Sequence, residues 1–342
     1  MFYFLVDLYG KFLRHMNNTT SSGIFTEQLW LRCLRLALYP SVFVVGVVGN
    51  ILVCSLFLLR KKNRTINAYF ILNLAFSDLL TLLLYLPFDL AYLENSWQWP
   101  FGSFLCKFIN ILSSVSITVS GSTLIAIAVD RHNAIVHGLR RRLCNKSIVV
   151  MSVVLIWIYA VSLQMPFMFA LQLIPGRECL VDLSWWPSED AVQMTYFFTT
   201  FVPKFLIPAI CISACYVGIV VHLRHHHKNL TKRGICKAGQ HFTEVRTQQN
   251  KKTTKLLTGL VTIYTVCILP HQVVLLMVIF NNEYLSSPYM REVHEFARFL
   301  TTANCCLNPL LYSAISRSFR NDVKAVLRRR VGSSTHNSVF NK

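Results

Sequence analysis

Long runs of apolar residues without a charge recur along the chain, and they predict its architecture. The run from Leu36 to Leu59 contains no charged residue at all. A bilayer core about 30 Å thick is crossed by a helix of about 20 apolar residues, so this run is long enough to span it. The pattern repeats and predicts seven membrane-spanning helices, at residues 36–60, 67–93, 103–136, 147–171, 193–224, 251–280 and 291–315.

The composition supports lipid as the main solvent of these helices. Of the 342 residues, 54% are hydrophobic and 14% are charged, whereas soluble proteins carry about a quarter charged residues. The fold class that we predict is therefore an all-α membrane protein, a seven-transmembrane helix bundle covering residues 36–315.

The net charge of +19 is unevenly distributed and predicts the orientation of the bundle. Most Lys and Arg residues fall in the predicted loops 60–66, 137–146 and 225–250 and in the tail, whereas most acids fall on the other side. By the positive-inside rule, this asymmetry predicts an extracellular N-terminus and a cytoplasmic tail. The basic side would face the anionic lipids of the inner leaflet rather than nucleic acid. We expect a multi-pass protein of the plasma membrane.

This orientation divides the chain into an extracellular segment at 1–35, the bundle, and a cytoplasmic segment at 316–342. Asn17 and Asn18 both begin N-x-T triplets, which are glycan acceptors when they lie outside the cell. The same side is oxidising, so a disulfide is allowed there. Cys106 and Cys179 both fall on that side, and Cys33 is a competing partner.

Asp78 is an isolated carboxylate in the second predicted span. Ionisable residues inside a membrane are costly and are functional hypotheses by default. Asn50, Ser120 and Asn304, from the first, third and seventh spans, are candidates to converge on it. Two interpretations stay open: a site for a small cation or a proton, and a structural hydrogen-bond network.

Prolines in three spans mark candidate bends. Pro208 lies in the fifth span, Pro270 lies in the sixth, and Pro309 lies between the polar residues Asn308 and Tyr312 in the seventh. Proline removes a backbone donor and clashes with the preceding turn, so a helix kinks there. Each kink is either a hinge or a static bend.

An Asp130–Arg131 pair ends the third predicted span. Arg131 is 25 positions after Cys106, or roughly 38 Å of helix, which is the bilayer core plus part of its headgroups. Arg131 is therefore expected at the cytoplasmic surface, where an ion pair with Asp130 is worth about 0–1 kcal/mol. The alternative is an Arg that only anchors the helix end in the headgroups.

Together, these motifs resemble those of the rhodopsin-like G-protein-coupled receptors over about residues 36–330. The fragment "LIAIAVDRHNAIVH" is most similar to neuropeptide receptors of the neuropeptide Y, galanin and tachykinin kinds. The resemblance rests on "GNILV" (Gly49–Val53), "NLAFSDLL" (Asn73–Leu80), "WPFG" before Cys106, "DRH" (Asp130–His132), Trp157, Pro208 with Tyr216, "CILP" (Cys267–Pro270), "NPLLY" (Asn308–Tyr312) and Phe319.

The resemblance implies a ligand-driven switch. Arg131, Tyr216 and Tyr312 would rearrange on activation and open a cytoplasmic cleft for a heterotrimeric G protein. It also implies a Cys106–Cys179 disulfide and a short amphipathic eighth helix, with arrestin and a receptor kinase as further partners. Apart from a sodium ion, no cofactor or metal is expected. The residues that match the sodium-site cluster are Asn50, Asp78, Ser120 and Asn304.

The chain departs from the family pattern at three interior positions. Gly121 stands where a branched aliphatic residue is usual, and Tyr264 stands where Phe is usual, both beside Pro208. Ile268 stands where Trp often forms the floor of the ligand pocket.

The outer residues predict a basic peptide ligand. Ser113 stands where amine receptors carry Asp, which disfavours an amine. Acidic residues on the outer side would steer a basic peptide, although they are also explained as solvated loop charges, and Arg298 is a candidate partner of Asp89. The candidate ligand contacts are Asp89, Tyr92, Ser113, Glu178, Asp182, Trp185, Trp186, Gln272, Glu295 and Arg298.

A rival function is an ion-coupled transporter or channel that uses Asp78 as a midplane ion site. The chain shows no obvious inverted repeat and few charges along any path. No nucleophile–base–acid set is visible inside the bundle, so an enzyme is not expected.

Overall fold

The computed structural model describes residues 29–59, 66–136, 146–173, 179–181, 189–233, 237–280, 288–315 and 319–325. The chain divides into two units, Met1–Pro40 and Ser41–Lys342, and the boundary between them falls within the first described helix. The account below concerns the second unit.

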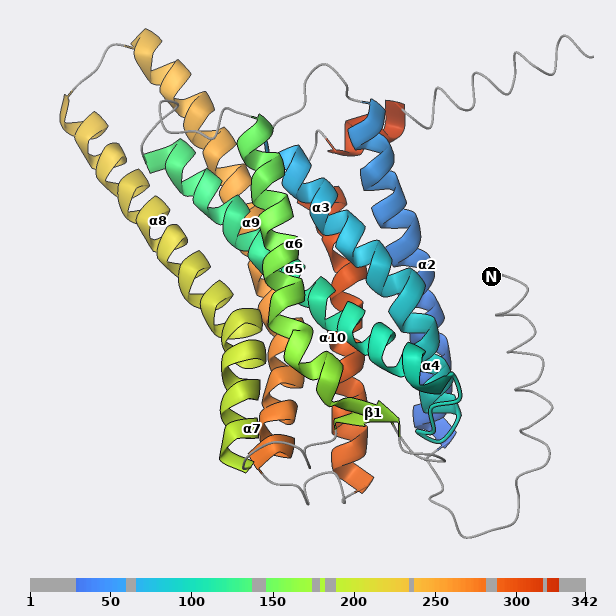
Figure 1. Ribbon diagram of the computed structural model, residues 1–342. Coiled ribbons are helices and arrows are strands. Elements are labelled where there is room, and N and C mark those ends of the chain that lie inside the picture. The colour runs from blue at the N-terminus through green and yellow to red at the C-terminus, as the bar shows by residue number, and fades with distance from the viewer. Residues whose placement is uncertain are drawn as a thin grey trace, which may run out of the picture. The chain divides into compact units, whose positions relative to one another are not determined.

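The described chain is almost entirely helical (Figure 1). The elements, in order, are α2 (Leu29–Leu59), α3 (Ile66–Leu80), the π-helical segment η1 (Thr81–Tyr85), α4 (Leu86–Glu94), α5 (Gly102–Val136), α6 (Lys146–Ala170), β1 (Leu171–Leu173), β2 (Cys179–Val181), α7 (Glu189–Tyr196), the π-helical segment η3 (Phe197–Leu206), α8 (Ile207–Arg233), α9 (Lys237–Phe280) and α10 (Pro288–Ile315).

Among the described residues, six helices are long and apolar enough to cross a membrane. α10 is more polar over its first half, which contains Arg291, Glu292, Glu295 and Arg298. The six spans are Leu29–Leu59, Ile66–Glu94, Gly102–Val136, Lys146–Ala170, Met194–His225 and Thr258–Val278. They correspond to the first six predicted spans, and α10 corresponds to the seventh.

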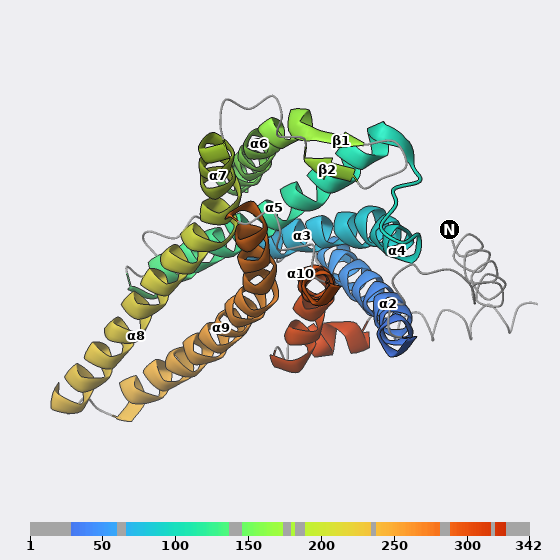
Figure 2. The ribbon, with the colours of Figure 1, turned by 90° about the horizontal axis from the view of Figure 1, so that it is seen from below.

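α5 is the central helix of the second unit. It contacts α3, α6, α8, α9 and both strands. Its apolar residues Leu124, Ile127 and Ala128 join a buried core to which α3, α8, α9 and α10 also contribute. α8 and α9 run side by side in both views (Figures 1 and 2).

Two hydrogen bonds of Asn73 fix α3 against α5 and α6. The Asn73 side chain on α3 donates to the Thr123 hydroxyl on α5 at 2.8 Å and accepts from the Trp157 indole of α6 at 2.9 Å. Asn73 and Thr123 are buried. Because a buried amide is costly when unpaired, these bonds specify how the three helices meet.

Several boundaries differ from those predicted. α2 begins at Leu29 rather than at residue 36, inside the predicted N-terminal segment. The predicted loop 225–250 is largely helix, since α8 runs to Arg233 and α9 starts at Lys237. Polar residues there carry no hydropathy signal, yet many of them are good helix formers.

A short hairpin was not expected from the sequence. β1 and β2 pair antiparallel, with Gln172 opposite Leu180, beside α5 and α6 (Figure 2). Three-residue strands are too short to give a readable alternation.

Candidate functional site

Polar side chains gather at three levels along α5. The end of the bundle near Cys106 is called the disulfide end below, and the opposite end is called the Arg131 end. The middle level lies around Asp78.

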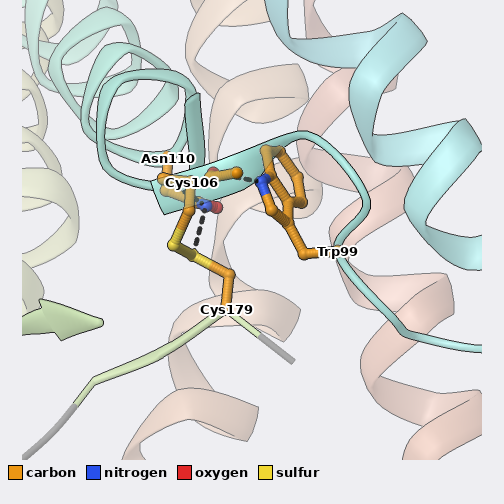
Figure 3. Close-up of a disulfide and its surroundings, with 5 residues drawn as sticks. Trp99, Cys106, Asn110 and Cys179 are labelled. Atoms are coloured by element: carbon orange, nitrogen blue, oxygen red, sulfur yellow. Dashed lines mark hydrogen bonds between the residues drawn. A yellow bond between two sulfur atoms is a disulfide. The ribbon is translucent and has the colours of Figure 1, made fainter. Parts of the chain in front are cut away.

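At the disulfide end, Cys106 is joined to Cys179 of β2, with Cα atoms 5.8 Å apart (Figure 3). This is the pairing that the resemblance implied, and Cys33 is a free cysteine. The Asn110 amide donates to the Cys106 carbonyl at 2.8 Å and contacts the Cys179 sulfur at 3.4 Å. The Trp99 indole donates to the Gly102 carbonyl at 3.0 Å, at the turn that starts α5. The hairpin is thereby tied to the first turns of α5.

A buried ion pair joins α4 to α10 at this end. Arg298 pairs with Asp89, whose side chain is fully buried. The Tyr85 hydroxyl donates to Asp89 at 3.1 Å and accepts from Arg298 at 3.1 Å. The Arg298 guanidinium also lies 5.5 Å from the Tyr92 ring centroid and 5.9 Å from that of Trp97. The sequence left Arg298 as a partner of Asp89 or as a ligand contact. In the structure it pairs with Asp89.

Beside this pair lies a second group of polar side chains, in which two half-buried histidines have buried Nδ1 atoms. His271 of α9 and His294 of α10 stack with ring centroids 5.6 Å apart. The Nδ1 atoms of both rings and the Gln272 carbonyl oxygen have no hydrogen-bond partner within the described residues. Lys204 of η3 is 3% exposed and lies within electrostatic reach of His271.

The sequence prediction omitted Lys204, His271 and His294. The signal for Lys204 was present, because a charge inside the predicted span 193–224 is costly. The two histidines are 23 positions apart on different helices, and only the packing of α9 against α10 shows that they meet.

For two further predicted ligand contacts, the structure gives the helix and the degree of burial. Ser113 is buried on α5, and Glu295 is half-buried on α10. Several predicted positions lie outside the described residues, namely Asn17, Asn18, Glu178, Asp182, Trp185 and Trp186.

At the middle level, Asp78 is tied to α10. Its Oδ2 accepts from the Asn308 amide at 2.9 Å. Ser120 instead bonds Ser77 at 3.1 Å, and the Asn50 amide donates to the Cys305 carbonyl at 2.9 Å. Asn308, a residue predicted for the hinge, is thus bonded directly to Asp78.

Two oxygen atoms at this level are of the kind that can ligate a hard cation. Asp78 Oδ1 and Asn304 Oδ1 are buried and lack a hydrogen-bond partner within the described residues. Carboxylate and amide oxygens are ligands that hard cations prefer. In the sodium site that the resemblance implies, Asp78 Oδ1 and Asn304 Oδ1 are the atoms that would hold the ion.

At the Arg131 end, Arg131 lies 3.3 Å from Asp130 Oδ2, with the Asp130 side chain fully buried and that of Arg131 17% exposed. Tyr312 of α10 is buried, with its ring 6.1 Å from Phe319 in the short helix 319–325. Tyr216 of α8 is half-buried against the core.

Pro270 and Pro309 lie inside α9 and α10. Each proline removes one backbone hydrogen-bond donor from its helix, which is consistent with both a hinge and a static bend.

The short helix 319–325 is tied to α10, because Arg320 donates to the Ser313 and Ala314 carbonyls at 2.9 and 2.8 Å.

The departures at Gly121 and Tyr264 meet at one point. The Tyr264 hydroxyl donates to the Lys204 carbonyl at 2.5 Å. The α-helical donor to that carbonyl would be residue 208, which is proline and has no N–H. A Cβ on Gly121 would lie 2.5 Å from the Tyr264 oxygen. Glycine therefore makes room for the hydroxyl that donates to this carbonyl.

Comparison with known proteins gives consistent matches. Residues 49–312 match the family described as 7 transmembrane receptor (rhodopsin family). Galanin receptor type 1 of Rattus norvegicus is 31% identical over 303 residues, covering 87% of this chain and 83% of the relative. The Substance-K receptor of Mus musculus is 26% identical over 315 residues (91% and 80%). The RYamide receptor of Tribolium castaneum is 27% identical over 324 residues (91% and 83%).

Proposed function

Because the chain belongs to the rhodopsin family of seven-transmembrane receptors, we propose that it is a cell-surface receptor for a neuropeptide. In this proposal a peptide binds at the disulfide end, which faces the outside of the cell. The Arg131 end faces the cytoplasm and activates a heterotrimeric G protein. Membership of this family excludes an enzyme and leaves no support for a transporter that uses Asp78.

One observation carries the proposal most strongly. α5 is a single helix that holds the disulfide near its start and the Asp130–Arg131 pair near its end. The two features are separated by roughly 38 Å, about the thickness of the bilayer core plus part of the headgroups. A ligand that binds one packing of the surrounding helices better than another shifts the population at the far end.

The peptide class is supported by the names of the relatives. The galanin, Substance-K and RYamide receptors bear the names of peptides. The acidic outer residues Glu178, Asp182 and Glu295 favour a peptide with basic groups. Because Asp89 is paired with Arg298 in the structure, we assign the recognition of basic groups to the other acids.

The experiment is ligand-dependent nucleotide exchange. The full chain in lipid nanodiscs, mixed with purified G protein, is screened with galanin, substance P, substance K and an RYamide peptide. We expect at least one peptide to accelerate exchange, and Arg131→Ala to abolish the response without loss of peptide binding. Ion flux in receptor vesicles, without exchange for any peptide, would overturn the proposal.

A further inference from the structure

Lys204 is a lysine in the middle of a membrane-crossing helix. It lies ten positions after Met194, where the span begins, or roughly 15 Å along a helix axis. On η3 it shares a buried face with Thr200 and Pro203, whereas Phe198 on the same segment is 61% exposed. Lys204 is only 3% exposed, so its ammonium group does not snorkel to the membrane surface.

Within the described part of the chain, no carboxylate forms an ion pair with Lys204. Asp89, an acid at the disulfide end, is paired with Arg298 instead. A buried charge without a partner costs several kcal/mol, and charges inside a membrane protein are retained for function. An anion supplied from outside the described residues would compensate the charge of Lys204.

The neighbours of Lys204 are suited to an anion with hydrogen-bonding oxygens. His271 lies within electrostatic reach of Lys204, Arg298 and His294. The Nδ1 atoms of both histidines lack a hydrogen-bond partner within the described residues, so each ring has a nitrogen to offer a ligand. A metal ion is a weaker interpretation, because the described residues contain no group of three metal-ligating side chains.

We propose that Lys204 binds a carboxylate of the ligand. This inference rests on the proposed function only in that the ligand enters the bundle at the disulfide end. The peptide then carries an acidic side chain or a free C-terminal acid that reaches η3, in addition to any basic groups that meet the outer acids.

This position also connects the ligand to the rest of the bundle. The backbone carbonyl of Lys204 accepts the Tyr264 hydroxyl of α9 at 2.5 Å. A carboxylate that pulls on the Lys204 side chain thus acts on the residue through which η3 and α9 are bonded.

The test uses a minimal probe in place of the peptide. Binding of hexanoate and of its neutral analogue hexanamide to the full chain in nanodiscs is measured by saturation-transfer NMR. We expect hexanoate to bind and hexanamide to bind about tenfold more weakly or not at all. Lys204→Met should weaken hexanoate by about tenfold or more, as removal of one partner of a buried charge pair does, whereas Lys204→Arg should largely restore it.

Lys107→Met is the matched control, because Lys107 is a half-buried lysine on α5 near the same end, and it should leave hexanoate binding unchanged. Thermal unfolding shows whether Lys204→Met has folded. Equal hexanoate binding by the wild type and Lys204→Met, or equal binding of hexanoate and hexanamide, would overturn the inference. Neither readout involves a G protein, so a carboxylate site without nucleotide exchange would count against the proposed function alone.

Discussion

Tyr264, Gly121 and Lys204 show how two departures from a family pattern can depend on each other. Tyrosine at position 264 supplies a hydroxyl where phenylalanine is usual, and it bonds the carbonyl that Pro208 cannot serve. The hydroxyl fits because Gly121 has no Cβ. Each departure is visible in the sequence. That the two depend on each other can be recognised only from the position of the Lys204 carbonyl in the structure.

We expect Tyr264→Phe to lower the free energy of unfolding by about 1–3 kcal/mol, because it leaves a buried carbonyl without this donor. Gly121→Ala alone should also destabilise, since its Cβ would lie 2.5 Å from the Tyr264 oxygen. When Tyr264→Phe is already present, that contact is gone, so Gly121→Ala should cost less there. The measurement is a double-mutant cycle by unfolding in SDS titrations, and strictly additive effects would contradict the coupling.

The role of a residue could be predicted from the sequence where its type allows one role. It could not be predicted where the role depends on which partner lies nearby in the fold. The sequence left two roles open for Arg298, and in the structure Arg298 pairs with Asp89. Lys204 could be flagged as a charge within a span. Whether such a lysine reaches the headgroups or is buried depends on the direction in which η3 presents it.

At the scale of elements, hydropathy predicted the spans because each exceeds the length that a bilayer demands. It could not predict η1 or η3, because a π-helical turn inside an α-helix leaves the apolar run uninterrupted. The start of α9 at Lys237 was also hidden, since its first turns are polar. Hydropathy indicates which residues lie in the lipid. It does not indicate whether a helix continues past the membrane surface.

Two glycines allow a direct comparison of helix contacts. A Cβ at Gly49 of α2 would lie 2.7 Å from Pro309 Cβ of α10, whereas a Cβ at Gly259 of α9 would meet the end of the Leu311 side chain at 3.0 Å. A proline ring in a kinked helix cannot rotate away, and a leucine can change rotamer. Alanine also gains about 1 kcal/mol of helix propensity over glycine.

We therefore expect Gly49→Ala to lower the free energy of unfolding by about 1–3 kcal/mol through overpacking, and Gly259→Ala to be near neutral. SDS titration of the two variants beside the wild type measures this. Equal effects would mean that α2 does not rest on the Pro309 kink in the way that the structure indicates.

At the scale of the whole molecule, α5 connects an end that holds a disulfide to an end that does not hold one within the described residues. Both ends carry an ion pair with a fully buried acid, but only the disulfide end adds a covalent bond to its pair among the described residues. The sequence predicted both ends because charge asymmetry and span length are properties of the whole chain. It could not predict how the intervening helices transmit a signal, which depends on contacts such as Asp78 with Asn308.

The Asp130–Arg131 pair is expected to hold the receptor in its resting state. Removing the charge of Asp130 breaks this pair, and a change of about 1 kcal/mol in the balance between two states corresponds to about a fivefold shift. We predict that Asp130→Asn raises ligand-free nucleotide exchange on purified G protein by about that factor. Asp322→Asn, an acid of the short helix 319–325, serves as the control and should leave basal exchange unchanged. If Asp130→Asn exchanges nucleotide at the wild-type basal rate while still responding to peptide, the pair anchors the helix end and does not restrain the switch.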